Sequence, residues 1–349
     1  MGEMTRVGAD SSKFPRSLEL GAIGTLEAMK AAGLQGTFFR SPFELSRTMD
    51  PAELSDVVQA AAALDMYIET GIAKVNPYAT PEAPEIREFG RGSYFDGMAR
   101  IIEAVADAGI TELWTATANY KHRLPGLFAC DRFRTDVDWE DQLAATEKYL
   151  TKLGPVLRGV GAHLNIETHE EITSFETIRL VEAGGPDAFG ITFDIANVVC
   201  RGEDPSAAAR RLAPYVRQTH FRDVALVETD DGYGRFIVPI GTGIIDWPVV
   251  LGLLAEHNPN LNISIEGITA TRAEMSLFLR EPRWAASHRD LTADEFAALE
   301  RSAAAYGAEV AAGRRPGPAE LRANVSEQQE LDFFTTSAAA LRDVITAAA

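Results

Sequence analysis

The chain has 349 residues, of which 46% are hydrophobic, so it can bury a large core either as one α/β barrel or as two domains. Asp and Glu number 51 against 33 Lys and Arg, and the net charge of −18 argues against nucleic acid or an anionic membrane as a partner. The start, MGEMTRVGAD, has no signal-peptide pattern, and no apolar stretch reaches the roughly 18 residues that span a bilayer, so we expect a cytoplasmic protein.

Strand-like runs follow one another along the chain, and each precedes a segment with helical periodicity. The expected strands cover residues 5–10, 36–40, 66–73, 112–119, 162–168, 189–197, 216–223 and 261–267. Asp50, with Glu53 three residues later, has the pattern of a helix N-cap. Cys130 and Cys200 belong to no CxxC pair, and we expect both to remain reduced thiols.

Eight successive strand and helix units predict a single (β/α)8 barrel, an α/β fold whose reactive groups lie at the C-terminal ends of the strands. A doubly wound sheet is the alternative, but no GxGxxG phosphate loop follows the first strand. We expect the barrel to cover residues 1–270, and residues 271–349 to supply a closing helix and a helical C-terminal extension. Long connections follow three of the strands and are expected to form walls or a lid over the active face, at 74–93, 120–138 and 224–243.

Four consecutive strands end on a side chain that can bind a metal, namely Glu167, Asp194, His220 and Glu266. In a barrel these side chains converge at one mouth, where the carboxylates would repel one another strongly without a cation. Oxygen ligands with one nitrogen fit Mn²⁺ best, with Mg²⁺, Co²⁺ or Zn²⁺ as other occupants. The sequence therefore predicts one divalent ion held by this quartet.

A metal and a pair of glutamates can remove a proton beside the carbonyl of a sugar, because the cation stabilises the enediolate that forms. Glu167 and Glu266 come from different strands, so one can take the proton and the other can return it, as in an isomerase or epimerase. If a leaving group lies β to the carbonyl, the same chemistry makes the enzyme a lyase. His122, just past the fourth strand in NYKHRLP, is the candidate for an additional catalytic acid or base over the substrate.

The segments NIETHE, TFDIAN, THFRD, GTGIIDW and SIEG resemble the xylose isomerase-like barrels, a family that includes sugar-phosphate isomerases and ketose 3-epimerases. The resemblance covers residues 110–268 well and implies the same four metal ligands. It also implies residues that contact the substrate or lie behind the ligands, namely His169, Asn197, Arg222, Asp223 and Asp246. Arg222 stands where the family usually has lysine, and Asn197 stands where the ketose epimerases have a histidine that contacts substrate.

The loop at 120–138, the long tail and Asn197 are also similar to the large catalytic subunit of bacterial C-glycoside deglycosidases. That likeness implies a 3-keto-glycoside substrate, deprotonation at C2 with release of the aglycone, and an oligomer that includes a small β-rich partner subunit. A sugar isomerase or ketose epimerase is the alternative. A metal-dependent hydrolase and a non-catalytic sugar-binding subunit stay open as other classes, although an oxygen-rich ligand set fits the common zinc sites poorly.

Overall fold

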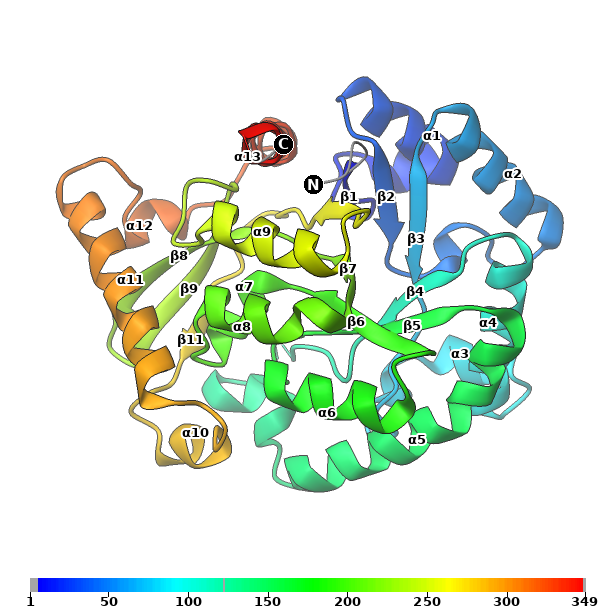
Figure 1. The fold of residues 1–349 in the computed structure, drawn as a ribbon, viewed down its shortest axis with the longest axis horizontal. Coiled ribbons are helices and arrows are strands. Elements are labelled where there is room, and N and C mark those ends of the chain that lie inside the picture. The colour runs from blue at the N-terminus through cyan, green and yellow to red at the C-terminus, as the bar shows by residue number, and fades with distance from the viewer. Residues whose placement is uncertain (1–5, 122, 348–349) are drawn as a thin grey trace.

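The computed structural model describes residues 6–121 and 123–347, and a parallel eight-stranded sheet forms its centre (Figure 1). The strand order is β10-β1-β2-β3-β4-β5-β6-β7, and a parallel bridge between Phe221 and Ile265 joins the two edges. The strands are β1 Val7–Asp10, β2 Gly36–Phe39, β3 Tyr67–Gly71, β4 Glu112–Thr115, β5 His163–Glu167, β6 Phe189–Phe193, β7 Val216–Thr219 and β10 Ile263–Ile265. Each lies within a strand expected from the sequence, so the (β/α)8 barrel is confirmed.

Helices surround the barrel, and several begin at a side chain that accepts hydrogen bonds from the first turn (Figure 1). Asp50 caps α2 in the predicted way and accepts from the backbone N–H of Ala52 at 2.9 Å. The helices up to the last barrel strand are α1 Ser17–Ala31, α2 Pro51–Ala63, α3 Pro84–Phe89, α4 Tyr94–Asp107, α5 Trp139–Val160, α6 Ser174–Gly184, α7 Ile195–Cys200, α8 Pro205–Leu212 and α9 Trp247–His257. Among the residues described, none of the helices has both the length and the apolar character needed to cross a bilayer.

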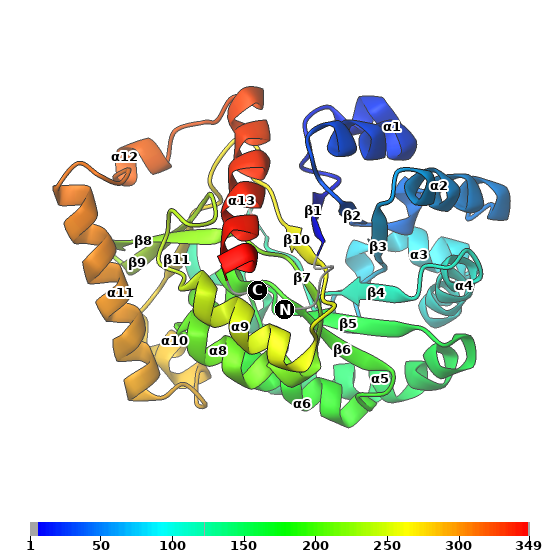
Figure 2. The ribbon, with the colours of Figure 1, turned by 45° about the horizontal axis from the view of Figure 1, so that its top comes forward.

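The helix that closes the barrel is the last one in the chain, α13 Glu327–Ala347. It packs against α9, β1 and β10, as Figure 2 shows. The ring of Phe334 on this helix lies so close to Gly267 that a Cβ atom there would be 2.3 Å from it. Since Gly267 directly follows Glu266, α13 fixes the strand end that carries this glutamate, and only glycine fits the contact.

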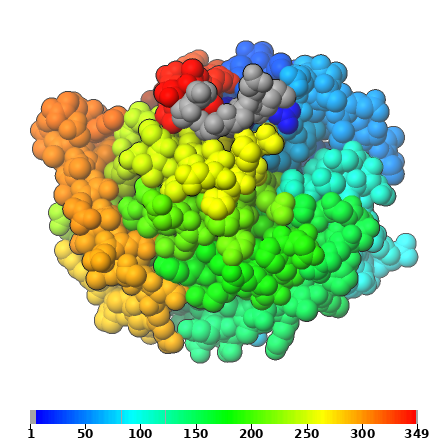
Figure 3. Space-filling view, in the orientation of Figure 1, coloured from blue at the N-terminus to red at the C-terminus, as the bar shows by residue number. Residues whose placement is uncertain are grey.

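A second, antiparallel sheet lies beside the barrel and was not predicted. The stretch at 224–243, expected as a connection, contains the hairpin β8 Asp223–Thr229 and β9 Gly232–Val238, and β11 Met275–Leu277 adds a third strand. The segment between β11 and α13 forms α10 Pro282–Ser287, α11 Ala293–Ala311 and α12 Pro318–Leu321. Helix α11 packs on β8, and this segment, orange in Figure 3, forms one flank of the molecule. The expected wall is therefore a sheet supported by the tail.

Candidate metal centre and active site

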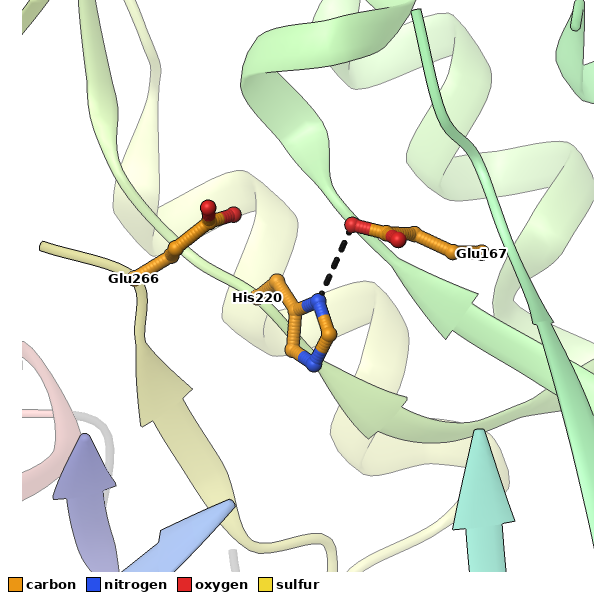
Figure 4. A group of neighbouring side chains, drawn as sticks. All are labelled: Glu167, His220 and Glu266. Atoms are coloured by element: carbon orange, nitrogen blue, oxygen red, sulfur yellow. Dashed lines mark hydrogen bonds and ion pairs between the residues drawn. The ribbon is translucent and has the colours of Figure 1, made fainter. Parts of the chain in front are cut away.

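Three strand-end side chains of the predicted quartet gather at the mouth of the barrel. Glu167 ends β5, His220 follows β7 and Glu266 follows β10, and one donor atom from each lies within 4.8 Å of the others. All three are almost completely buried, with at most 4% of each residue exposed. Figure 4 shows the two carboxylates on either side of the imidazole, with Nδ1 of His220 3.0 Å from Oε1 of Glu167.

Aromatic rings from strands on the opposite side of the barrel fix the imidazole of His220. The ring of Phe38 on β2 stacks on it with centroids 3.9 Å apart, and Trp114 on β4 meets it edge-on at 4.7 Å. Strand pairing thus carries Phe38 and Trp114 into the interior at the depth of the site. The imidazole is held in one orientation before any ligand binds.

Asp194, the fourth predicted ligand, makes a different set of contacts. Its Oδ1 atom accepts from the backbone N–H of Ala196 at 2.9 Å and so caps α7. Its Oδ2 atom accepts from the side-chain amide of Asn197 at 2.7 Å and from the guanidinium of Arg222. Burial raises the pKa of Asp194 to about 7, although the charge of Arg222 opposes this rise. Asp194 is thus next to the trio but held by a cation.

Cations from three barrel loops surround the carboxylate of Glu266. The Oε1 atom lies 2.6 Å from Nζ of Lys13 and 2.6 Å from Nη2 of Arg40, and Oε2 lies 2.9 Å from Nη2 of Arg222. Burial opposes ionisation of this carboxyl, but the charges of Arg222, Lys13 and Arg40 outweigh it and hold the pKa of Glu266 well below its usual range. Glu266 is therefore a strongly stabilised carboxylate.

Sequence reasoning missed three charged residues of this mouth. Asp10 ends β1 and binds Arg40 at 2.9 Å, and Lys13 follows in the same loop. The signal was available for two of them, because Asp10 ends its strand on a carboxylate just as Glu167 does, and Arg40 comes directly after β2. Nothing in the sequence singled out Lys13, which lies three residues beyond its strand.

His169 belongs to a second cluster, beside the loop that follows β4. Its Nδ1 atom lies 2.6 Å from Glu170 and 2.5 Å from Glu171, and Glu171 accepts from the backbone N–H of Ala118 at 2.8 Å. Burial opposes protonation of the imidazole, but the two glutamates outweigh it and raise the pKa of His169 well above its usual value. The cluster therefore connects the ends of β4 and β5.

The two aspartates expected behind the ligands stabilise the chain around α9. Asp223 accepts from the backbone N–H of Gly241 and from the indole N–H of Trp247, both at 2.9 Å. Asp246 is exposed and caps α9, with the N–H of Val249 as its donor. Neither forms a hydrogen bond with His220 among the described residues, and the hydrogen bonds that they do form fix a loop and a helix end. His122, the expected acid or base, lies outside the described residues.

The trio has the composition and spacing of a site for a divalent cation. The Nδ1 atom of His220 and the Oε1 atom of Glu167 lie 3.0 Å apart, close enough that both could bind one ion. The Oε2 atom of Glu266 is buried, and its ion pair with Arg222 at 2.9 Å is its one contact with a polar group among the described residues, so a lone pair is available there. Oxygen and imidazole donors suit Mn²⁺, Mg²⁺ or Zn²⁺, and the residues present fit such an ion.

Comparison with proteins of known sequence finds a dehydratase and a decarboxylase among the relatives. The chain is 25% identical to an inosose dehydratase of Lacticaseibacillus casei over 256 residues, 66% of this chain and 76% of that protein. It is 22% identical to a 3-oxo-isoapionate decarboxylase of Pectobacterium atrosepticum over 259 residues, which are 73% of this chain and 80% of that protein. A shorter match of 91 residues with 30% identity joins it to the protein YihM of Escherichia coli K12, covering 26% of this chain and 28% of that one.

Solved structures with the same fold include sugar epimerases. A D-psicose 3-epimerase of Clostridium cellulolyticum superposes with a TM-score of 0.59 and 12% identity over 89% of this chain and all of the other. A 3-keto-D-glucoside 4-epimerase of Escherichia coli superposes with a TM-score of 0.56 and 14% identity over 86% of this chain and 100% of that one. The family model for xylose isomerase-like TIM barrels matches residues 26–312. The chain therefore belongs to the xylose isomerase-like TIM barrel family.

Proposed function

We propose that this protein is a divalent-metal-dependent lyase that removes a proton beside the carbonyl of a keto sugar and then expels a β-leaving group. The reaction we favour is cleavage of a 3-keto-glycoside with release of its aglycone. The observation that carries the proposal is the buried trio of Glu167, His220 and Glu266. These side chains would hold the ion, with Asp194 as the fourth member of the quartet.

A bound divalent cation polarises the sugar carbonyl and acidifies the neighbouring C–H bond. The chain must then supply a proton acceptor. Glu167 is the better candidate, since within the described residues it forms no ion pair with lysine or arginine. Glu266 carries three such pairs, and a carboxylate so strongly stabilised is a poor base.

This asymmetry between the two glutamates favours elimination over epimerisation. A two-base epimerase needs comparable groups on both faces of the sugar, whereas a lyase needs one base and a leaving group. The dehydratase and the decarboxylase among the relatives carry out reactions that remove a group from a keto compound, which supports the same choice. Asn197 stands where a substrate-contacting histidine is expected in the ketose epimerases, and it is already engaged with Asp194.

A sugar isomerase or epimerase is the second candidate, and the epimerase folds among the structural neighbours favour it. Incubation in D₂O with Mn²⁺ separates the two. On a 3-keto-glycoside, the lyase releases the aglycone and exchanges the proton beside the carbonyl of the remaining substrate for deuterium, and chelation stops both. On the free 3-keto sugar it exchanges the proton without inverting the carbon. Accumulation of an inverted sugar without aglycone release would establish the epimerase, and no exchange with either compound would refute the proposed chemistry.

A further inference from the structure

Three cations of decreasing solvent exposure lie at the metal centre. The exposed fraction of the side chain falls from 40% for Arg40 to 22% for Lys13 and 5% for Arg222. All three contact the same carboxylate, that of Glu266. A ligand that approached beside β1 and β2 would meet Arg40, which is paired with Asp10, and Lys13 before it reached Arg222, in a protein whose net charge is −18. Such an arrangement concentrates anions and repels cations.

Lys13 and Arg222 keep hydrogen-bonding capacity beyond their contacts with Glu266. Lys13 donates to Glu266 alone among the described residues, although its ammonium group has three N–H donors. The Nε atom of Arg222 has no hydrogen-bond partner among the described residues, and only 5% of this side chain is exposed. An unpaired guanidinium donor at this depth is costly unless a ligand completes its contacts.

The charges of the mouth indicate how many negative charges that ligand carries. When Asp194 is ionised, as a cation bound beside it would favour, the carboxylates of Asp10, Glu167, Asp194 and Glu266 exceed the three cations by one negative charge. A divalent ion would reverse the balance to one positive charge. A buried site is most stable when its charges cancel, so a ligand with a single negative charge fits and a dianion would overshoot.

We propose that the substrate is a keto sugar acid whose carboxylate is bound by Lys13 and Arg40, with Arg222 behind them. The keto group of this substrate is inferred from the proposed function, whereas its carboxylate is inferred from the three cations. The carboxylate enters between the loops after β1 and β2 and accepts charge-assisted hydrogen bonds from the ammonium and guanidinium groups. Lys13 is thereby a specificity-determining residue.

The test compares two sugars that differ in one group. In 5-keto-D-gluconate a carboxylate replaces the terminal CH₂OH of L-sorbose, and calorimetric titration of the Mn²⁺-loaded protein measures the affinity for each. We expect the acid to bind about 10- to 100-fold more tightly, the range of one or two charge-assisted contacts. Lys13→Gln should remove most of this preference, Lys13→Arg should keep it, and Lys148→Gln on the outer face of α5 should leave it unchanged.

A second measurement reports on Lys13 without any sugar. Removing a positive charge beside the ligand carboxylates should strengthen Mn²⁺ binding in Lys13→Gln by about 2- to 10-fold at low ionic strength. Equal affinity for acid and L-sorbose, undetectable binding of the acid at millimolar concentration, or an unchanged preference in Lys13→Gln would overturn the proposal. Tighter binding of D-fructose 6-phosphate than of the keto acid would show that the three cations select a phosphate and not a carboxylate.

The outcomes for substrate class and for reaction are separable. Deuterium exchange of L-sorbose as fast as that of the keto acid would support proton abstraction and refute selection of a carboxylate. Tight, Lys13-dependent binding of the acid without any exchange would support the carboxylate site and refute the reaction.

Discussion

Nδ1 of His220 and Oε1 of Glu167 lie 3.0 Å apart, between the ends of β7 and β5, and neither residue exposes more than 4% of its surface. The contact joins two strands that are not neighbours, because β6 lies between them. Two donor atoms brought together so deep in the barrel are placed for a shared partner.

The first prediction concerns metal content. Purified protein should hold about one divalent ion per chain, and His220→Ala should reduce this to a small fraction, since one of three clustered donors is lost. Elemental analysis after gel filtration measures it. His257→Ala, at the exposed end of α9, is the control. Metal content in His220→Ala equal to that of the parent would remove the trio from consideration.

The second prediction concerns Arg222, which contacts both Asp194 and Glu266. In Arg222→Met the metal-free protein should lose about 2–4 kcal/mol of stability, because two buried carboxylates lose their shared cation. Mn²⁺ replaces that charge, so the rise in melting temperature on adding Mn²⁺ should be larger than in the parent. Arg217→Met on β7 provides the comparison. A smaller Mn²⁺-dependent rise in Arg222→Met would mean that Arg222 supports the ion instead of substituting for it.

The eight strands could be predicted because each one is a short buried run next to an amphipathic helix, a pattern that depends on local sequence. The complete second sheet could not be predicted from local sequence, because its third strand lies far from the first two along the chain. β9 pairs with β11, and Arg235 lies opposite Met275, forty residues further along the chain. The hairpin itself had a local signal, the turn TDDGY between two β-rich runs, which was read as part of a loop.

The same distinction applies to the site. Glu167, His220 and Glu266 were found because acids and imidazoles at strand ends have a known chemistry. Lys13 and Arg40 were missed because a cation after a strand has no fixed meaning until its partner is known, and that partner, Glu266, is more than 200 residues away. These cations and the carboxylate that they neutralise meet only when the barrel has folded, so local sequence does not show that they are partners.

The third prediction separates the two aspartates near α9. Asp246→Ala should lower stability by about 1 kcal/mol through loss of the helix cap and should leave Mn²⁺ affinity unchanged. Asp223→Ala should cost about 2–4 kcal/mol, because several buried N–H donors lose their acceptor. Chemical denaturation and Mn²⁺ titration of both variants measure these effects. A large loss of Mn²⁺ affinity in Asp246→Ala would assign that residue to the metal centre after all.

The fourth prediction concerns pH. Burial, together with the nearby charge of Glu112, raises the pKa of Glu69 from 4.5 to about 8. Between these values the folded protein keeps a proton that the unfolded chain has released, so this group makes stability fall as pH rises from 4.5 to about 8. Glu69→Gln, which removes the titration, should be about 1–3 kcal/mol more stable than the parent at pH 8. The comparison is of unfolding free energies at pH 5 and pH 8. An equal pH slope in the parent and the Gln variant would show that Glu69 is ionised throughout.

The position of α13 affects how the chain can fold during synthesis. Strand β1 is made first, yet it pairs with β10 and is covered by α13, the last helix. As the chain leaves the ribosome, β1 to β7 can associate in order, but the seam of the barrel must wait for β10, and its cover must wait for a further 61 residues, from 266 to 326. The nascent protein therefore exposes an open edge at β1 for most of its translation. An open strand edge of this kind is where we expect chaperones to bind and where premature termination would be most damaging.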